Sequence, residues 1–277
     1  MFRVALFFPV AIALLVSLVD GGAWTASNTA GTTGSLQGHY HAWWAIVQLP
    51  KSTVEKMLPT GRSMVLEEIS LPGLLADHHP VVLEIGTEHD VGPVGFPKWI
   101  LMKFPEFKLD IPFVSTAPSS GGDTHTSLNY KSIVYTDSKF LSFSSRFQYN
   151  LNAKKAAIKM TDTTYDLTFE GKKFTASFDP SGEFTSPENF SNFSVYQNIM
   201  SQTWFGSYNS NKKTCANHYY QFDSIQVRPA SMTMQAQTGV LDVNFPDIQI
   251  NTPSVTEALG TVEVWACFTI SNPFDCL

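Results

Sequence analysis

The sequence predicts one mostly β (α+β) domain with a few short helices. Segments rich in Val, Ile, Thr, Tyr and Phe recur along the whole chain, and such composition favours strands. Of the 277 residues, 43% are hydrophobic and only 15% are charged, which is enough apolar material for a substantial core. No repeat and no long Pro/Gly/Ser-rich linker divides the chain, so residues 39–277 are expected to form a single domain.

The amino-terminal residues have the composition of a secretory signal peptide. Arg3 supplies a positive start, residues 4–19 are free of charge, and Gly21-Gly22-Ala23 offers small residues for cleavage. We therefore interpret residues 1–23 as a signal peptide, with a retained anchor as the alternative. Residues 24–38 are small and polar and are expected to be a flexible amino terminus.

Alternating or apolar runs bounded by turn residues predict the strands. They cover residues 40–49, 63–69, 81–86, 99–113, 128–136, a hairpin over 164–178, a strand pair over 219–227 and 231–241, and a last strand over 260–270. The hairpin is expected to turn at Glu170-Gly171, and Pro105 predicts an edge or a bulge in its strand.

Capping signals predict the short helices. Ser52 and Glu55 form a capping-box pattern before a helix that stops ahead of Pro59, and Asp137 or Ser138 can cap a helix reaching about Arg146. A helix over 189–200 is ambiguous, and another is expected to begin at 252.

Cysteine content and glycosylation motifs agree with export. One pair among Cys215, Cys267 and Cys276 could form a disulfide in an oxidising compartment, and the sequence does not choose which. Asn189 and Asn192 each begin an Asn-x-Ser glycosylation motif, so the chain is expected to be a glycoprotein that is secreted or lies in the lumen of the secretory pathway.

Several function classes are disfavoured. The net charge of -6 is spread along the chain without a basic patch, which argues against nucleic acid as a partner. There is no GxSxG motif and no phosphate-binding glycine loop. The possible zinc ligands are His39 and His41, with His78-His79 and His89-Asp90, but their spacing is a weak signal for a zinc site. We expect neither a metal nor a cofactor.

Lys154-Lys155 is the candidate for covalent chemistry. The pair follows an aromatic run and lies among small apolar residues. A lysine amine is nucleophilic only when its pKa is lowered from about 10.4, through loss of solvent or through a second positive charge. Acetoacetate decarboxylase is the established example of a lysine activated by a neighbouring cation. Lys172-Lys173 and Lys212-Lys213 are expected to be solvated, and ordinary solvation is also the alternative for Lys154-Lys155.

Two carboxylates lie within apolar runs. Glu84 is enclosed by Val81-Val82-Leu83 and Ile85, and Glu106 by Pro105 and Phe107. A buried carboxylate must be paired or neutralised. The alternative is that each faces outward from an alternating strand.

Taken in order, these segments resemble the acetoacetate decarboxylase family over residues 39–270. The resemblance rests on the short helix ending at Pro59, on Glu84 and Glu106 in their runs, on the helix ending at Ser145-Arg146, on Lys154-Lys155 and on the long carboxy-terminal strands. It implies a closed or cone-shaped antiparallel β-barrel around a buried pocket, and assembly into homo-oligomers. It also implies that Lys154 forms a Schiff base with a small β-keto acid, that Lys155 lowers its pKa, and that Glu84 and Glu106 are pocket carboxylates.

The resemblance leads to a lyase that decarboxylates or otherwise transforms a keto acid without a cofactor. The alternative is a non-catalytic secreted barrel that binds an apolar or carbonyl-containing ligand. It is favoured by Ala153, which precedes the lysine pair where the family commonly has proline, and by Tyr40 or His41, which stand where the decarboxylases have an arginine. No membrane span is expected once the signal is removed.

Overall fold

The computed structural model describes residues 34–116, 127–190, 192–242, 244–246, 248–252 and 259–276. The signal peptide, most of the flexible amino terminus, the 117–126 segment and the helix expected after residue 252 lie outside the described residues. No helix in the described part is both long enough and apolar enough to span a bilayer.

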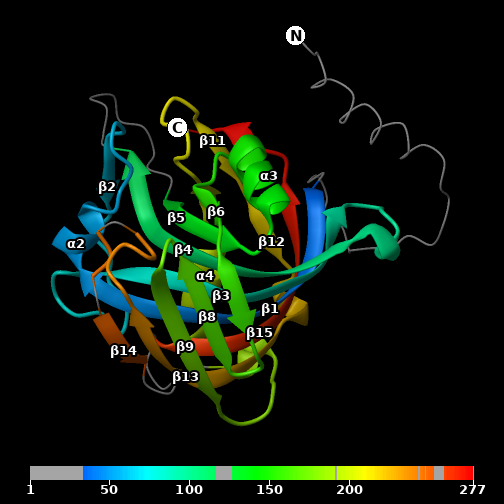
Figure 1. Cartoon of the computed structure of the whole chain (residues 1–277). Coiled ribbons are helices and arrows are strands. Elements are labelled where there is room, and N and C mark those ends of the chain that lie inside the picture. The colour runs from blue at the N-terminus through cyan, green and yellow to red at the C-terminus, as the bar shows by residue number, and fades with distance from the viewer. Residues whose placement is uncertain are drawn as a thin grey trace.

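The described elements are mostly strands (Figure 1). The longer strands are β1 (Gly34–Pro50), β3 (His78–Pro93), β4 (Met102–Thr116), β5 (Leu128–Thr136), β8 (Thr164–Phe169), β9 (Lys172–Pro180), β13 (Gln226–Ala236), β14 (Ile248–Thr252) and β15 (Thr261–Ser271). The short strands are β2 (Met64–Leu66), β6 (Ala153–Lys155), β7 (Ala157–Met160), β10 (Thr203–Phe205), β11 (Thr214–Ala216), β12 (His218–Tyr220) and β16 (Phe274–Asp275). The helices are α2 (Lys51–Glu55), α3 (Lys139–Tyr149) and α4 (Phe193–Met200), with 3-10 turns η1 (Lys98–Ile100), η2 (Pro187–Asn189) and η3 (Phe222–Ser224).

All the strands belong to one large, strongly curved sheet. Its main path runs β16-β11-β10-β5-β4-β3-β1-β15-β13-β9-β8-β7, and β2, β6, β12 and β14 pair with strands on this path. Most pairs are antiparallel, but β5 pairs in parallel with β6 and with β10. Along the described strands the path does not close on itself, so the closed barrel of the prediction is not observed.

The long central strands are buried on both faces. On one face Trp43 of β1, Leu83 of β3 and Phe107 of β4 belong to the larger apolar cluster. On the other face Tyr40, Trp44 and Val82 belong to a second cluster, which includes α4. A sheet covered on both faces needs near-continuous apolar strands, which explains the uninterrupted runs in the sequence.

A close approach of β1 to β3 depends on a glycine. A Cβ added to Gly86 would lie 2.3 Å from the His41 carbonyl oxygen and 2.6 Å from the Ala42 Cα. Gly86 lies between Glu84 and Glu88 on β3, so this close approach falls within the segment that carries both glutamates.

The mostly β fold, the strand over 128–136 and the hairpin are confirmed. Glu170 and Gly171 adopt positive φ values of 49° and 79°, as a tight hairpin turn requires. The Ser138 hydroxyl accepts a hydrogen bond from the Leu141 amide at the start of α3, so Ser138 is the cap.

Three details of the prediction are wrong. Strand β1 begins at Gly34, inside the stretch expected to be flexible, because its first residues pair with β15 and β3. Helix α2 has Pro50 at its amino-terminal cap position and no side-chain cap from Ser52. The two strands expected over 219–241 do not pair with each other: β12 pairs with β15, and β13 pairs with β9, β14 and β15.

One disulfide joins the carboxy-terminal end to β11. Cys215 and Cys276 are bonded with their Cα atoms 5.8 Å apart, and Cys267 remains a free thiol. The bond holds β16 against β11 beside α3, near the carboxy terminus in Figure 1.

Candidate functional site

Charged side chains alternate with apolar ones on three adjacent strands. On β4, Glu106, Lys108 and Asp110 alternate with Phe107, Leu109 and Ile111, which belong to the larger apolar cluster. Successive side chains of a strand point to opposite faces, so the three charged side chains share the other face. On the neighbouring strands, Glu84 and Glu88 of β3 and Lys131 of β5 join them.

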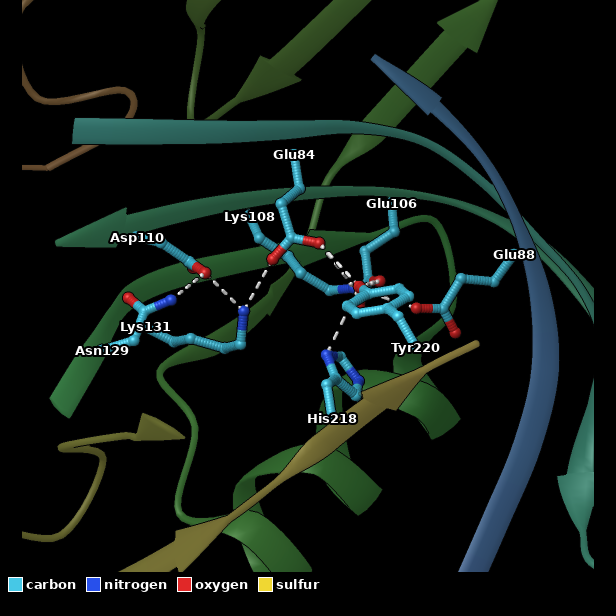
Figure 2. A network of polar contacts seen from close by, with 9 residues as sticks. All are labelled: Glu84, Glu88, Glu106, Lys108, Asp110, Asn129, Lys131, His218 and Tyr220. Carbon is cyan, nitrogen blue, oxygen red and sulfur yellow. Dashed lines mark hydrogen bonds and ion pairs between the residues drawn. The ribbon is translucent and has the colours of Figure 1, made fainter. Parts of the chain in front are cut away.

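These six side chains form a buried ionic network (Figure 2). Lys131 Nζ lies 2.7 Å from Glu84 Oε1 and 2.6 Å from Asp110 Oδ2. Lys108 Nζ lies 2.6 Å from Glu106 Oε2, 2.9 Å from Glu88 Oε1 and 3.8 Å from Glu84 Oε2. Glu84 therefore stands between the two ammonium groups, and each ammonium group has more than one carboxyl partner.

The network fixes the charge of both lysines. Burial alone would lower the pKa of Lys108 and of Lys131, but the surrounding carboxylates outweigh it and raise both pKa values above their ordinary value. Burial would likewise raise the pKa of Glu84, but the two ammonium groups hold that pKa below its ordinary value. Both lysines are thus ammonium ions at neutral pH, and neither has the free amine that a Schiff base requires.

The pKa values of Glu106 and Asp110 are shifted in the opposite direction. Burial, reinforced by the negative charge of Glu88, raises the pKa of Glu106 well above its ordinary value. Burial also raises the pKa of Asp110 to about 7, although Lys131 opposes the shift. Glu106 thus favours its neutral form more than an exposed glutamate does, and it shares Lys108 as an ion-pair partner with Glu88.

Strand β12 adds two aromatic polar groups. The Tyr220 hydroxyl lies 3.4 Å from Glu84 Oε2 and 3.5 Å from His218 Nδ1. Burial, together with the charges of Lys108 and Lys131, lowers the pKa of His218 well below its ordinary value, so its ring is neutral.

A cavity of about 180 Å³ opens above this network. Glu88, Glu106, Lys108, Lys131 and His218 provide its polar floor. Its walls are mostly apolar and come from β1, β3, β4, β10, β15 and α3; they include Leu36, Val91, Phe104, Tyr149, Leu151 and Trp204.

Three buried polar atoms of the lining residues lack a hydrogen-bond partner within the described part of the chain, and one of them, Glu106 Oε2, is ion-paired with Lys108. His218 Nε2 and Trp204 Nε1 form no hydrogen bond to any described residue, although the two side chains are only 6% and 3% exposed. A buried polar group without a partner is costly, which makes these two atoms candidates for hydrogen bonds to a ligand.

The four residues predicted from the sequence do not come together. Glu84 and Glu106 both belong to the buried network, so the alternative that they face outward is wrong. Lys154 and Lys155, on β6, are not among the residues that line this cavity. Lys154 Nζ lies 4.9 Å from the centre of the Phe169 ring, Lys155 is exposed, and Ala153 is the residue of β6 that packs toward Trp204.

The histidines expected to be weak metal candidates have other partners. His41 Nε2 lies 2.7 Å from Glu263 Oε1, and its ring stacks on Trp265. His79 Nε2 lies 2.8 Å from the Pro112 carbonyl oxygen. Within the described ranges, no group of three His, Cys, Asp or Glu side chains is arranged to hold a metal ion.

Sequence reasoning missed Glu88, Lys108, Asp110, Lys131, His218 and Tyr220. The available signal was the period-two spacing of Glu106, Lys108 and Asp110, which places three charges on one face of a strand. That pattern is the same for a solvated face as for the floor of a pocket. Only the pairing of β4 with β3 and β5, and the cover provided by β12 and α3, make it a buried site.

Comparisons with known proteins agree on the architecture. No protein-family model matches the chain, and none of the curated proteins matches it. A solved structure of acetoacetate decarboxylase from Legionella pneumophila is similar with a TM-score of 0.57 and 11% identity, over 94% of this chain and 93% of that one. The chain has the acetoacetate decarboxylase-like fold.

Other enzymes with this fold are similar to the same degree. The enduracididine biosynthesis enzyme MppR, solved in complex with pyruvate, matches with a TM-score of 0.57 and 9% identity, over 92% of this chain and 98% of that one. An acetoacetate decarboxylase-like enzyme from Sphingomonas wittichii RW1 gives a TM-score of 0.56 and 11% identity, over 92% and 100%. The sequence resemblance is thus confirmed as a fold, and identities this low leave the chemistry to the residues of this chain.

Proposed function

We propose that the protein binds a small, neutral carbonyl compound in this cavity and exchanges protons with it. The observation that carries the proposal is the pair of buried carboxyl groups of Glu106 and Glu88, which both line the cavity and share Lys108 as a partner. Burial, reinforced by the negative charge of Glu88, raises the pKa of Glu106 well above its ordinary value and so favours its neutral form. A neutral carboxyl group beside a second carboxyl group is the arrangement that general acid–base catalysis uses.

The charge of the floor favours a neutral ligand. Each ammonium group already has at least two carboxyl partners, so an incoming carboxylate would find no unpaired cation on the described floor. It would also meet Glu88 and Glu106. The cavity volume of about 180 Å³ limits the ligand to a few carbon atoms, and the apolar walls favour an alkyl body.

The proposed reaction is enolisation. The Glu106 carboxyl donates its proton to the carbonyl oxygen while the Glu88 carboxylate takes a proton from the neighbouring carbon, which gives the neutral enol. Reversal of both transfers restores the ketone, and a deuteron is introduced at carbon when the solvent is D₂O. The same enol is the nucleophile of an aldol addition, and the enol of a β-hydroxy ketone can lose water in a dehydration step.

Deuterium incorporation into 2-pentanone, followed by proton NMR, tests this proposal. The wild-type protein should accelerate the exchange, and Glu106→Gln should lower the rate by roughly a hundredfold or more, which is typical for loss of a general acid. Lys154→Gln is the control and should keep the full rate. Loss of exchange in Lys154→Gln with retention in Glu106→Gln would refute the proposal and support imine formation at Lys154.

The Schiff-base lyase implied by the sequence resemblance remains a separate proposal. Its support is the shared fold with acetoacetate decarboxylase, but Lys154 is not among the residues lining the cavity described above. Acetoacetate in the same NMR experiment discriminates between the two, since the imine route predicts loss of carbon dioxide that depends on Lys154.

Binding without turnover is the second candidate. The apolar walls and the unpartnered atoms of His218 and Trp204 favour it, because they need only a ligand and no reaction. A change in tryptophan fluorescence on addition of 2-pentanone, with no deuterium incorporation by the wild-type protein, would support this candidate.

Export of the protein stays a proposal. The Cys215–Cys276 disulfide supports it, because disulfides persist in oxidising compartments. Asn189 is exposed and Asn192 half-buried, so glycosylation of Asn189 can be checked by mass spectrometry of the secreted chain.

A further inference from the structure

Helix α3 presents two different faces. Leu141, Ser144, Ser145 and Gln148 line the cavity. Phe140, Phe143 and Phe147 are 67%, 63% and 69% exposed, although phenylalanine is ordinarily buried. At spacings of three and four residues they form one continuous stripe on the helix surface.

The exposed stripe extends beyond the helix. The Phe143 and Phe147 rings stack with their centres 6.0 Å apart. Tyr208, which is 56% exposed, follows in the loop that Asn150 holds against the end of α3. A clustered group of exposed aromatic side chains marks an interaction surface more often than scattered ones do.

Cationic groups border the aromatic stripe. The Arg146 guanidinium lies 5.4 Å from the centre of the Tyr208 ring, and Lys212 Nζ lies 5.4 Å from the centre of the Phe147 ring. Lys139 is exposed in the first turn of the helix, with the carboxylate of Asp137 before it. We call these seven residues the α3 patch: Phe140, Phe143, Phe147, Tyr208, Lys139, Arg146 and Lys212.

We propose that the α3 patch docks the protein on an anionic phospholipid surface. Aromatic side chains on one helix face, bordered by Lys and Arg, are the composition of helices that lie in the membrane interface. The aromatic rings enter the boundary between headgroups and acyl chains, and the cations contact the lipid phosphates.

A second copy of the chain fits the patch less well. A two-fold interface places the same surface on both subunits, so it would gather Lys139, Arg146 and Lys212 of both copies in one interface. Like charges brought together in an interface oppose association. An anionic lipid surface complements the same groups.

The patch adjoins the cavity, because Phe140 belongs to the stripe and also lines the cavity. Docking therefore brings the cavity mouth to the lipid interface, where small neutral ligands with alkyl bodies partition. This consequence alone rests on the proposed function, and the docking surface is tested without any ligand or activity.

Co-sedimentation of the full chain with vesicles of phosphatidylcholine, with and without phosphatidylglycerol, tests the proposal. The wild-type protein should sediment with the anionic vesicles and be released at high salt. Phe143→Ser/Phe147→Ser should weaken its partition by roughly tenfold or more, given the apolar area that two phenylalanines bury. Arg146→Gln/Lys212→Gln should remove the preference for phosphatidylglycerol.

The matched control is Val65→Ser/Leu75→Ser, which removes exposed apolar side chains elsewhere. The Leu75 amide donates a hydrogen bond to Gln48, near the end of β1 remote from the cavity residue Leu36. The control variant should sediment as the wild-type protein does, with unchanged thermal midpoints for all the variants. Residues 4–19 are common to every variant, so equal sedimentation of all of them would overturn the proposal. Oligomers that the phenylalanine variant dissociates, without vesicle binding by the wild type, would overturn it in favour of a second copy.

Discussion

Two pairs of lysines in this protein differ in their spacing in the sequence, in their burial and in their position relative to the cavity. Lys154 and Lys155 are adjacent in sequence and lie on the short strand β6, half-buried and exposed respectively. Lys108 and Lys131 are 23 residues apart by number, yet they lie on the neighbouring strands β4 and β5 within one buried network. Only the second pair reaches the cavity floor.

The difference follows from strand geometry. Successive residues of a strand point to opposite faces, so adjacent lysines on a strand cannot both face one pocket. Residues paired across neighbouring strands share a face and lie within contact distance. A pocket with two lysines therefore takes them from different strands, and such lysines need not be adjacent in the sequence.

The largest expected difference between the two pairs is in stability. Lys131→Met leaves Glu84 and Asp110 without their shared ammonium partner in the interior, and loss of one partner from a buried ion pair costs roughly 3–5 kcal/mol. Lys154→Met should change the free energy of unfolding by less than about 1 kcal/mol. Urea denaturation of both variants measures the difference, and equal effects would show that the network is not buried as described.

The pH dependence of stability tests the charge balance of the network. Because the pKa of Asp110 is raised to about 7 from 3.8, the folded state binds a proton that the unfolded state releases. The stabilising contribution of the neutral carboxyl is complete below about pH 4 and is lost as the pH rises to about 7, at roughly 1.4 kcal/mol for each unit of pKa difference. The free energy of unfolding of the wild-type protein minus that of Asp110→Asn should therefore fall over this range, and a difference that rises with pH would contradict the assignment.

The smallest expected effect on stability is that of replacing Glu106, and it distinguishes this carboxyl group from that of Glu84. Because burial raises the pKa of Glu106 and favours its neutral form, Glu106→Gln should change the free energy of unfolding by no more than about 1 kcal/mol. Glu84→Gln removes an ionised group between two ammonium ions and should be clearly more destabilising. Urea denaturation of the two variants at pH 7 measures this difference. A larger loss of stability in Glu106→Gln than in Glu84→Gln would mean that Glu106, and not Glu84, is ionised.

The sequence was sufficient for the fold class and for most of the elements. Apolar runs such as 128–136 and the turn at Glu170-Gly171 are local signals, and local geometry produces what they predict. Glu84 and Glu106 were noted because each lies in an apolar run, and their expected role as pocket carboxylates came from the family resemblance. Their partners Lys108 and Lys131 were not identified. Charged residues at every second position of a strand are expected on a solvent-exposed face as much as on a pocket floor. Pairings such as β12 with β15 depend on the whole chain and have no local signal.

Reductive trapping most directly tests whether the cavity network, and not Lys154, is the working centre. The protein is incubated with acetoacetate or 2-pentanone, reduced with borohydride and mapped by mass spectrometry. Because Lys108 and Lys131 are held as ammonium ions and Lys154 is not among the residues lining the cavity, we expect no stoichiometric adduct, only slow labelling spread over exposed lysines. A single stoichiometric adduct on Lys154 would contradict this account and establish the imine route.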